Sequence, residues 1–257
     1  MDYLIIGRVA LLASGLTLFS GFGLGTILLP VFGLFFPIEI AIVLTAIVHF
    51  MNNLFKLFLF GKKANKEVIF KFGIPALIFA FLGAYLLKLL TEMQPLFQYV
   101  ISEKTFEIMP LKLIIGLLLI LFALFDFIPK LKNLEFDKKY LSVGGVLSGF
   151  FGGISGHQGA LRSAFLIRSG LSKEAFIATG VVIACLVDVS RLSIYGSKIM
   201  SNELALNYKL VVLATLSAFL GVYFGTKLLQ KTTYKSIQNM VALLLLVYGF
   251  LLILGII

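Results

Sequence analysis

Hydrophobic residues occur along the chain in ten runs that are separated by short polar or charged segments. A bilayer core about 30 Å thick needs roughly 20 apolar residues in a helix, and a helix satisfies its own backbone hydrogen bonds within such a run. The pattern therefore predicts an all-α, polytopic integral membrane protein with about 8–10 membrane helices. No basic segment precedes the first run, so we expect a helix there rather than a signal peptide. The long runs cover residues 3–20, 38–60, 68–90, 111–128, 140–153, 175–195, 204–229 and 236–257.

Two further runs, 26–36 and 158–168, are too short to cross a membrane alone. Eleven residues at 1.5 Å per residue extend over about 16 Å, which is roughly half of the hydrocarbon core. Each short run follows a glycine-rich stretch, which predicts a helix break within the membrane, and the short helices are either re-entrant or spanning. The glycines are Gly21, Gly23 and Gly25 in the first stretch, and Gly152, Gly153, Gly156 and Gly159 in the second.

The chain contains two related halves. Residues 20–61 and 155–196 align without a gap at an offset of 135 with six identities, and the motif at 80–85 recurs at 218–223. Two matches in the same order favour an internal duplication over a coincidence of composition. We expect a first membrane repeat at 1–128, a cytoplasmic linker at 129–139 and a second membrane repeat at 140–257.

Charged residues predict the orientation of these repeats. The connections after the third, fifth, seventh and ninth runs carry twelve Lys and Arg residues against four acidic ones, and the opposite connections carry an acidic excess. Basic loops stay in the cytoplasm, so both termini are expected on the outer side of the cytoplasmic membrane. Corresponding loops then lie on opposite sides, which predicts two inverted-topology repeats. This arrangement is typical of secondary transporters, whose sites lie near the midplane at broken helices.

Composition narrows the class of function. Hydrophobic residues make up 60% of the chain and charged residues 13%, and the mean hydropathy is +1.06. The net charge of +10 lies between hydrophobic runs, so we expect the lipid bilayer as a partner and no nucleic acid. Cys185 is the only cysteine and is expected to be a small buried side chain. No metal-ligand spacing or phosphate-binding loop is present, so we expect no cofactor and no metal.

The glycine-rich breaks resemble the paired signatures of a transporter family. The first half reads SGFGLG at 20–25 with Pro30 behind it, and the second half reads SGFFGGISG at 148–156. GHQGALRSAFLI at 156–167 and EAFIATG at 174–180 are similar to one branch of the same family, the TauE/SafE sulfite exporters, also called the toluene-sulfonate uptake permeases. The resemblance implies a secondary transporter of small sulfur-containing anions such as sulfite or organosulfonates. Phe165 departs from it, because it stands where the first half has Pro30.

The candidate substrate-binding residues gather at the two breaks. The N-terminus of a half-helix offers free N–H groups and a positive dipole end to an anion. Gly21, Gly23, Gly25, Gly156 and Gly159 would let the backbone approach a ligand closely, and tight helix packing by small residues is the alternative.

Arg162 is the strongest single candidate for substrate binding, because an intramembrane guanidinium can hold sulfonate or sulfite oxygens through two donors. Its alternatives are snorkelling and a structural pair with Asp188. His157 and Gln158 stand in the second break, where His157 could also couple transport to protons. Asn53 corresponds to Asp188 and offers neutral hydrogen bonds to substrate or to a neighbouring helix.

Three further residues are candidates for coupling or gating. His49 lies in the middle of the third run and could carry a proton, with a packing role as the alternative. Asp188 and Arg191 lie three residues apart on one helical face, so they could pair, and the pair could be exchanged during gating. Arg191 and its counterpart Lys56 both stand near the end of a run, so both could instead snorkel to the membrane surface.

These residues favour a secondary active transporter that moves a small sulfur-containing oxyanion by alternating access. An anion channel and a membrane subunit of a larger complex remain as alternatives. An enzyme is disfavoured, because a reaction needs more positioned acid, base or nucleophile groups than one aspartate and two histidines. The expected oligomeric state is a monomer or a homodimer.

Overall fold

A computed structural model describes residues 2–20, 23–132, 134–200, 207–228 and 235–257 of the chain. Helices dominate it, and the described residues include ten helices of eight or more residues, so the predicted all-α polytopic membrane fold is confirmed. The helices are α1 (Asp2–Ser20), α2 (Leu24–Gly33), α3 (Ile38–Phe60), α4 (Lys66–Val68), α5 (Ile74–Thr91), α6 (Pro110–Phe127), α7 (Pro129–Lys132), α8 (Leu141–Ser155), α9 (Gly159–Leu166), α10 (Lys173–Met200), α11 (Tyr208–Leu228) and α12 (Lys235–Ile253).

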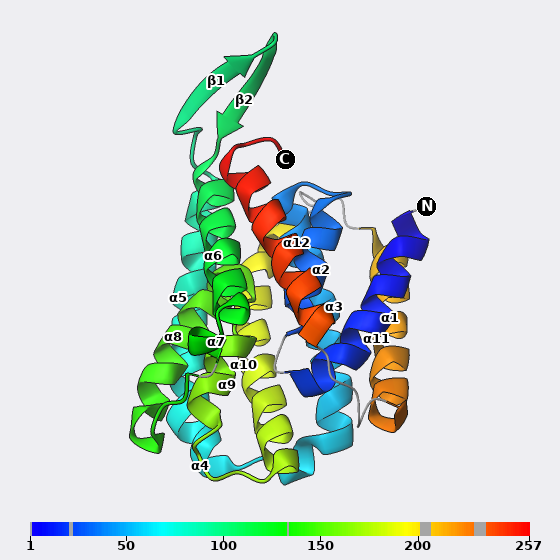
Figure 1. Cartoon of the computed structure of the whole chain (residues 1–257), viewed down its shortest axis with the longest axis vertical. Helices are drawn as coiled ribbons and strands as arrows, with labels where there is room; N and C mark the ends of the chain where they lie inside the picture. Colours follow the sequence, from blue (N-terminus) through cyan, green and yellow to red (C-terminus); the bar gives the residue numbers. More distant parts are fainter. Residues whose placement is uncertain (1, 21–22, 133, 201–206, 229–234) are drawn as a thin grey trace.

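Four helical stretches in the described part are long and apolar enough to span a bilayer. In α3 and α10, 61% of the most apolar window is buried, compared with 39% in the stretch that contains α5 and 33% in α11. The first two are therefore the centre of the bundle, and the other two present apolar side chains outward. Figure 1 shows α3 and α10 between the α5–α8 side and the α1–α11 side of the molecule.

Corresponding helices of the two halves make corresponding contacts. In the order of the chain, α1, α2, α3, α5 and α6 correspond to α8, α9, α10, α11 and α12. Helix α8 packs along α5 as α1 packs along α11, and α5 contacts α10 as α11 contacts α3. The pairs α3–α10 and α6–α12 are each formed by two corresponding helices. This exchange is what a two-fold relation between the predicted repeats requires.

Glycines allow the outer helix pairs to pack backbone against backbone. Gly145, Gly149 and Gly153 form a stripe on α8, and a Cβ on any of them would collide with a backbone oxygen, that of Phe72 in the turn before α5 or those of Ala76 and Ala80 in α5. Gly221 on α11 contacts the backbone of α1 at Leu11 in the same way. Small residues at such spacing are the usual means of close helix association in membranes. Gly153 therefore serves helix packing and not the helix break to which the sequence analysis assigned it.

The breaks are shorter than the sequence predicts. Helix α1 ends at Ser20 and α2 begins at Leu24, so Gly25 lies in the first turn of α2. Helix α8 continues through Ser155, and α9 begins at Gly159. The second break therefore consists of residues 156–158, and Gly156 makes the turn with a φ of +78°.

A hairpin for which the sequence analysis made no prediction connects α5 and α6. Strands β1 (Phe97–Ile101) and β2 (Lys104–Ile108) pair antiparallel, and the turn residues Ser102 and Glu103 have positive φ values of 47° and 68°. Such values are those of a two-residue type I′ turn, which matches the twist of the strands. The hairpin projects from the end of the bundle where α1 begins and α12 ends (Figure 1).

Candidate functional site

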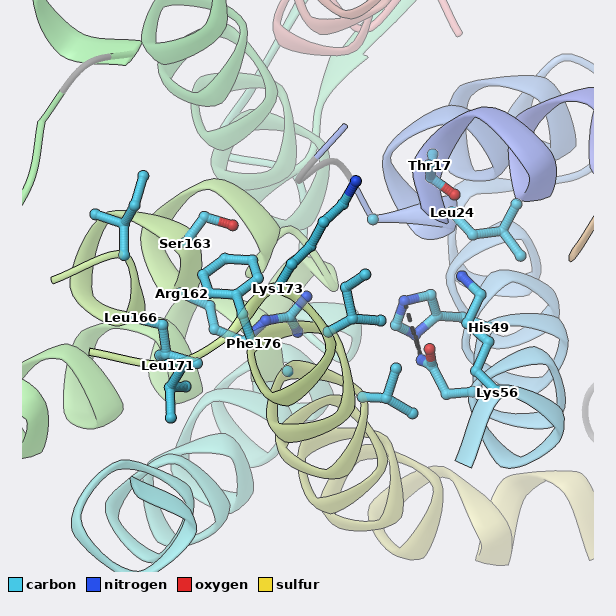
Figure 2. A pocket seen from close by; sticks show the side chains of 16 residues that line it. Thr17, Leu24, His49, Lys56, Arg162, Ser163, Leu166, Leu171, Lys173 and Phe176 are labelled. Carbon is cyan, nitrogen blue, oxygen red and sulfur yellow. Dashed lines mark hydrogen bonds between the residues drawn. The ribbon is translucent and has the colours of Figure 1, made fainter. Parts of the chain in front are cut away.

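A cavity of about 360 Å³ lies between the two halves of the bundle. The first half contributes the end of α1, the start of α2 and one face of α3, and the second half contributes α9, the α9–α10 connection and the start of α10. Figure 2 shows the cationic side chains of Arg162, Lys173 and Lys56 among this lining. The lining residues are Thr17, Gly23, Leu24, His49, Asn53, Lys56, Arg162, Ser163, Leu166, Ile167, Leu171, Lys173, Phe176, Ile177, Gly180 and Val181.

Helix α3 gives the cavity its polar wall. His49, Asn53 and Lys56 follow one another at spacings of four and three residues, so they lie on one helical face. All three are buried, with exposed fractions of 4–6%. Lys56 makes no hydrogen bond or ion pair with any residue of the described ranges, and its side chain runs up the cavity wall toward His49 (Figure 2). The alternative that Lys56 snorkels to the membrane surface is therefore wrong.

Asp188 joins the two central helices behind this wall. His49 Nδ1 lies 2.6 Å from Asp188 Oδ2, and the Asn53 amide donates to the same oxygen at 3.3 Å. Arg191 Nη1 donates to the other oxygen at 3.5 Å, which confirms the predicted Asp188–Arg191 pair. Asn53 and Asp188 occupy corresponding positions at the offset of 135 and contact each other through this hydrogen bond. The Asp188 carboxylate is fully buried, with an exposed fraction of 0%.

Arg162 enters the cavity from the other half. It lies one turn into α9, and its guanidinium passes over Gly180 of α10, where an added Cβ would stand 3.3 Å from Arg162 Nε. No carboxylate or carbonyl in the described ranges forms a hydrogen bond or ion pair with it. The predicted alternatives, snorkelling and a pair with Asp188, are therefore not what the structure shows. Arg168, six residues later in the sequence, lies outside the cavity and pairs with Glu135 at 2.8 Å.

The two glycine breaks meet behind the cavity. A Cβ on Gly25 would lie 3.9 Å from the carbonyl oxygen of Gly156, and a Cβ on Gly23 would lie 3.7 Å from His49 Nε2. Gly23 precedes α2 in extended conformation, and it lines the cavity together with Leu24, the first residue of α2. A shared anion site requires the two breaks to lie close together, and Gly25 and Gly156 do so.

The residues of the second break are buried away from the cavity. His157 has an exposed fraction of 3%, stacks on Phe122 with ring centroids 5.9 Å apart, and places Nδ1 3.0 Å from the Ser155 carbonyl. Gln158 is the residue before α9 and is exposed by 2%. Neither lines the cavity, and neither does Gly25, Gly156 or Gly159.

Of the predicted site residues, the structure thus brings Gly23, His49, Asn53 and Arg162 into one cavity. Asp188 and Arg191 lie directly behind its polar wall. Arg191 is exposed by only 1%, so the alternative that it snorkels to the surface is wrong. Gly21 lies outside the described residues.

The sequence analysis missed two residues that shape the cavity. Lys56 could have been found from the spacing of His49, Asn53 and Lys56, which places all three on one face of a helix. Gly180 belongs to the motif at 174–180, but its role of making room for Arg162 depends on the packing of α9 against α10, which no local pattern encodes.

The electrostatics of the site favour an anion. Lys56, Arg162 and Lys173 line the cavity, its described lining contains no carboxylate, and the Asp188 carboxylate behind it pairs with Arg191. Buried charge without a partner is costly, and an anionic ligand would offset that cost. Among the described residues, no group of three or more His, Cys, Asp or Glu side chains could hold a metal ion.

Residues 6–252 match the family model described as sulfite exporter TauE/SafE. The match covers nearly the whole chain, so the protein belongs to this family of membrane transporters and is a multi-pass membrane protein. Neither the curated proteins nor the solved structures with which the chain was compared give a match.

Proposed function

We propose that the protein is a secondary active transporter that moves a small sulfur-containing oxyanion, such as sulfite or a sulfonate, across the cytoplasmic membrane by alternating access. The observation that carries the proposal is the cavity between the halves, in which Lys56 and Arg162 face one space and neither is paired within the described residues. Arg162 offers two parallel donors to the oxygens of an oxyanion, and Lys56 offers a mobile ammonium group. The backbone at the start of α2 belongs to the same lining through Gly23 and Leu24.

The size of the cavity agrees with a small ligand. Small-molecule sites occupy about 300–1,000 Å³ and combine an apolar lining with few polar groups. The apolar part comes from Leu166, Phe176 and Val181, among others, and would suit the organic group of a sulfonate. The polar part faces it from α3 and α9 (Figure 2).

A carrier explains the cavity better than a channel. His49 and Asn53 line the cavity, and behind them the Asp188 carboxylate and the second break at residues 156–158 are buried. A cavity that is bounded by such buried residues is what one state of an alternating-access cycle requires. A permanently open pore would need a lining that continues past these residues.

The orientation and the coupling ion belong to the same proposal. Residues at the end of the bundle where the cavity reaches the α9–α10 connection include Lys62, Lys63, Lys66, Arg168 and Lys173, so this end is assigned to the cytoplasm. His49 is the candidate for proton coupling, because it is the only histidine in the cavity lining and contacts Asp188 directly.

The proposal is tested with purified protein in liposomes. Uptake of sulfite, an alkyl sulfonate, sulfate and chloride is measured under imposed proton and sodium gradients. We expect saturable transport of one of the sulfur oxyanions, accelerated by a gradient. Flux that does not saturate would favour the channel, and no flux of any of the four anions would contradict the proposal.

A further inference from the structure

Arg191 has an unusual set of hydrogen bonds for a buried arginine. Its Nη1 atom contacts Asp188 at 3.5 Å, but its Nε and Nη2 atoms have no hydrogen-bond partner in the described ranges. The side chain is exposed by only 1%. Leaving buried charged donors unpaired is costly, so such donors call for a physical reason.

The unpaired atoms are those that recognise oxyanions. Nε and Nη2 point along the same edge of the guanidinium and can donate two parallel hydrogen bonds to two oxygens of one anion. Asp188 occupies the other part of the group through Nη1. Arg191 is thus held by Asp188 through Nη1, and Nε and Nη2 make no hydrogen bond in the described ranges, with the buried Tyr195 hydroxyl as their neighbour one turn later on α10.

Gln158 supplies a second unpaired group at the same break. Its amide nitrogen and oxygen both lack a partner in the described ranges, and its side chain is exposed by 2%. Its Cβ lies against Gly152, as does Val187, one turn before Arg191 on α10. Gly156 places the backbone of the break against the guanidinium, because a Cβ there would stand 2.7 Å from Arg191 Nη1.

The same positions in the first half form the wall of the open cavity. At the offset of 135, Arg191 corresponds to Lys56 and Gln158 corresponds to Gly23, and both of these counterparts line the cavity. Lys56 and Gly23 are thus open to a cavity, whereas Arg191 and Gln158 are buried and have side-chain atoms without a hydrogen-bond partner in the described ranges. In a transporter of two related halves, the buried pair is the one that the other state of the cycle would open.

We infer that Arg191 and Gln158 form a second subsite for the oxyanion, closed in this structure and opened when the transporter faces the opposite side of the membrane. The inference rests on the proposed function. The anion leaves Arg162 and Lys56, passes the Asp188 cluster, and meets the two-donor edge of Arg191 and the Gln158 amide.

Single-cysteine labelling tests the inference. In a Cys185→Ala background, Lys56→Cys and Gln158→Cys are exposed to a membrane-impermeant thiol reagent in right-side-out and in inverted vesicles. We expect Lys56→Cys to react from one side and Gln158→Cys from the opposite side, with an alkyl sulfonate, which does not consume the thiol reagent, slowing both reactions. Reaction of Gln158→Cys from the same side as Lys56→Cys, or from neither side while Lys56→Cys reacts, would overturn the inference. Failure of Lys56→Cys to react from either side would instead contradict the proposed function.

A matched pair of charge-conserving variants gives a second readout. Arg191→Lys and Arg162→Lys each keep a positive charge and lose the two-donor edge, so both are assayed with sulfite offered from each side in turn. We expect Arg191→Lys to raise the apparent KM for sulfite roughly 10- to 100-fold when sulfite is offered from the side on which Gln158→Cys reacts, because a charge-assisted hydrogen bond is lost. Arg162→Lys should raise the apparent KM to a similar extent from the other side. Equal KM changes from both sides, or no change in Arg191→Lys, would show that Arg191 only supports the fold.

Discussion

The two glycine breaks derive from similar sequence and lie in different surroundings. The first break and α3 border an open cavity, and Lys56 lines it without a partner in the described ranges. The second break and the part of α10 around Arg191 are buried, and Arg191 at the corresponding position is exposed by 1% and pairs with Asp188. Local sequence alone does not explain this difference, because both residues stand on the inner face of a central helix. The comparison teaches that corresponding positions of the two halves differ in burial and pairing, which is the asymmetry on which the proposed alternating-access cycle rests.

The largest expected effect comes from the open side. Arg162→Ala removes the only guanidinium in the cavity lining, so we expect sulfite transport in liposomes to fall to background. The matched control is Arg168→Ala, six residues away, whose exposed ion pair with Glu135 stabilises little. Wild-type flux in Arg162→Ala, or equal loss in both variants, would remove Arg162 from the site.

The next largest effect is expected on stability, at the buried Asp188 carboxylate between the two central helices. Asp188→Asn leaves the Arg191 guanidinium buried without a counter-charge, so we expect a loss of roughly 3–5 kcal/mol in stability, read as a lower Tm in detergent. The double variant Asp188→Asn/Arg191→Gln should regain part of that loss. The exposed Glu67, which pairs with Lys71 and Lys138, provides the control, since Glu67→Gln should leave the Tm unchanged. An unchanged Tm in Asp188→Asn would contradict the central role of the carboxylate.

Alanine at three glycines compares the breaks directly. Gly156→Ala combines a φ of +78° with a Cβ only 2.7 Å from Arg191 Nη1, whereas Gly170→Ala has a φ of +73° and open space. Gly25→Ala has neither problem, because its Cβ would lie 3.4 Å from Thr45 Cγ2. We expect Tm to fall most in Gly156→Ala, less in Gly170→Ala by the backbone cost of about 1–2 kcal/mol, and least in Gly25→Ala. Equal effects in Gly156→Ala and Gly170→Ala would show that the guanidinium is free to move away.

The smallest effect distinguishes the two histidines. His49 lines the cavity and faces Asp188, Asn53, Lys56 and Arg162, and His157 is stacked on Phe122 at the closed break. We therefore expect His49→Gln to abolish the acceleration of sulfite transport by an imposed proton gradient, and His157→Gln to keep it. The reverse result would move proton coupling to the second break.

Much of the fold follows from the sequence, because hydrophobic runs and their length dictate membrane helices. The predicted run 38–60 coincides with α3, and the short runs appear as α2 and α9. The hairpin at 97–108 was not predicted, because its turn uses Ser102 and Glu103 at positive φ instead of the usual glycine or asparagine.

The site was harder to predict, since it depends on how distant helices pack. Arg162 and Asn53 could be selected as polar residues within hydrophobic runs. Lys56 was assigned to the membrane surface because it stands near a helix end, whereas the fold turns it inward beside His49. His157 and Gln158 share a break with Gly156, but the packing of α8 on α10 turns them away from the cavity.

Calorimetric titration of the purified protein in detergent with sulfite tests most directly whether the cavity holds an oxyanion. The wild type, Arg162→Gln, Lys56→Gln and the control Arg168→Gln are compared at equal ionic strength. We predict saturable binding in the wild type and in Arg168→Gln, weaker binding in Lys56→Gln, and no measurable binding in Arg162→Gln. Equal affinity in all four proteins would contradict the account.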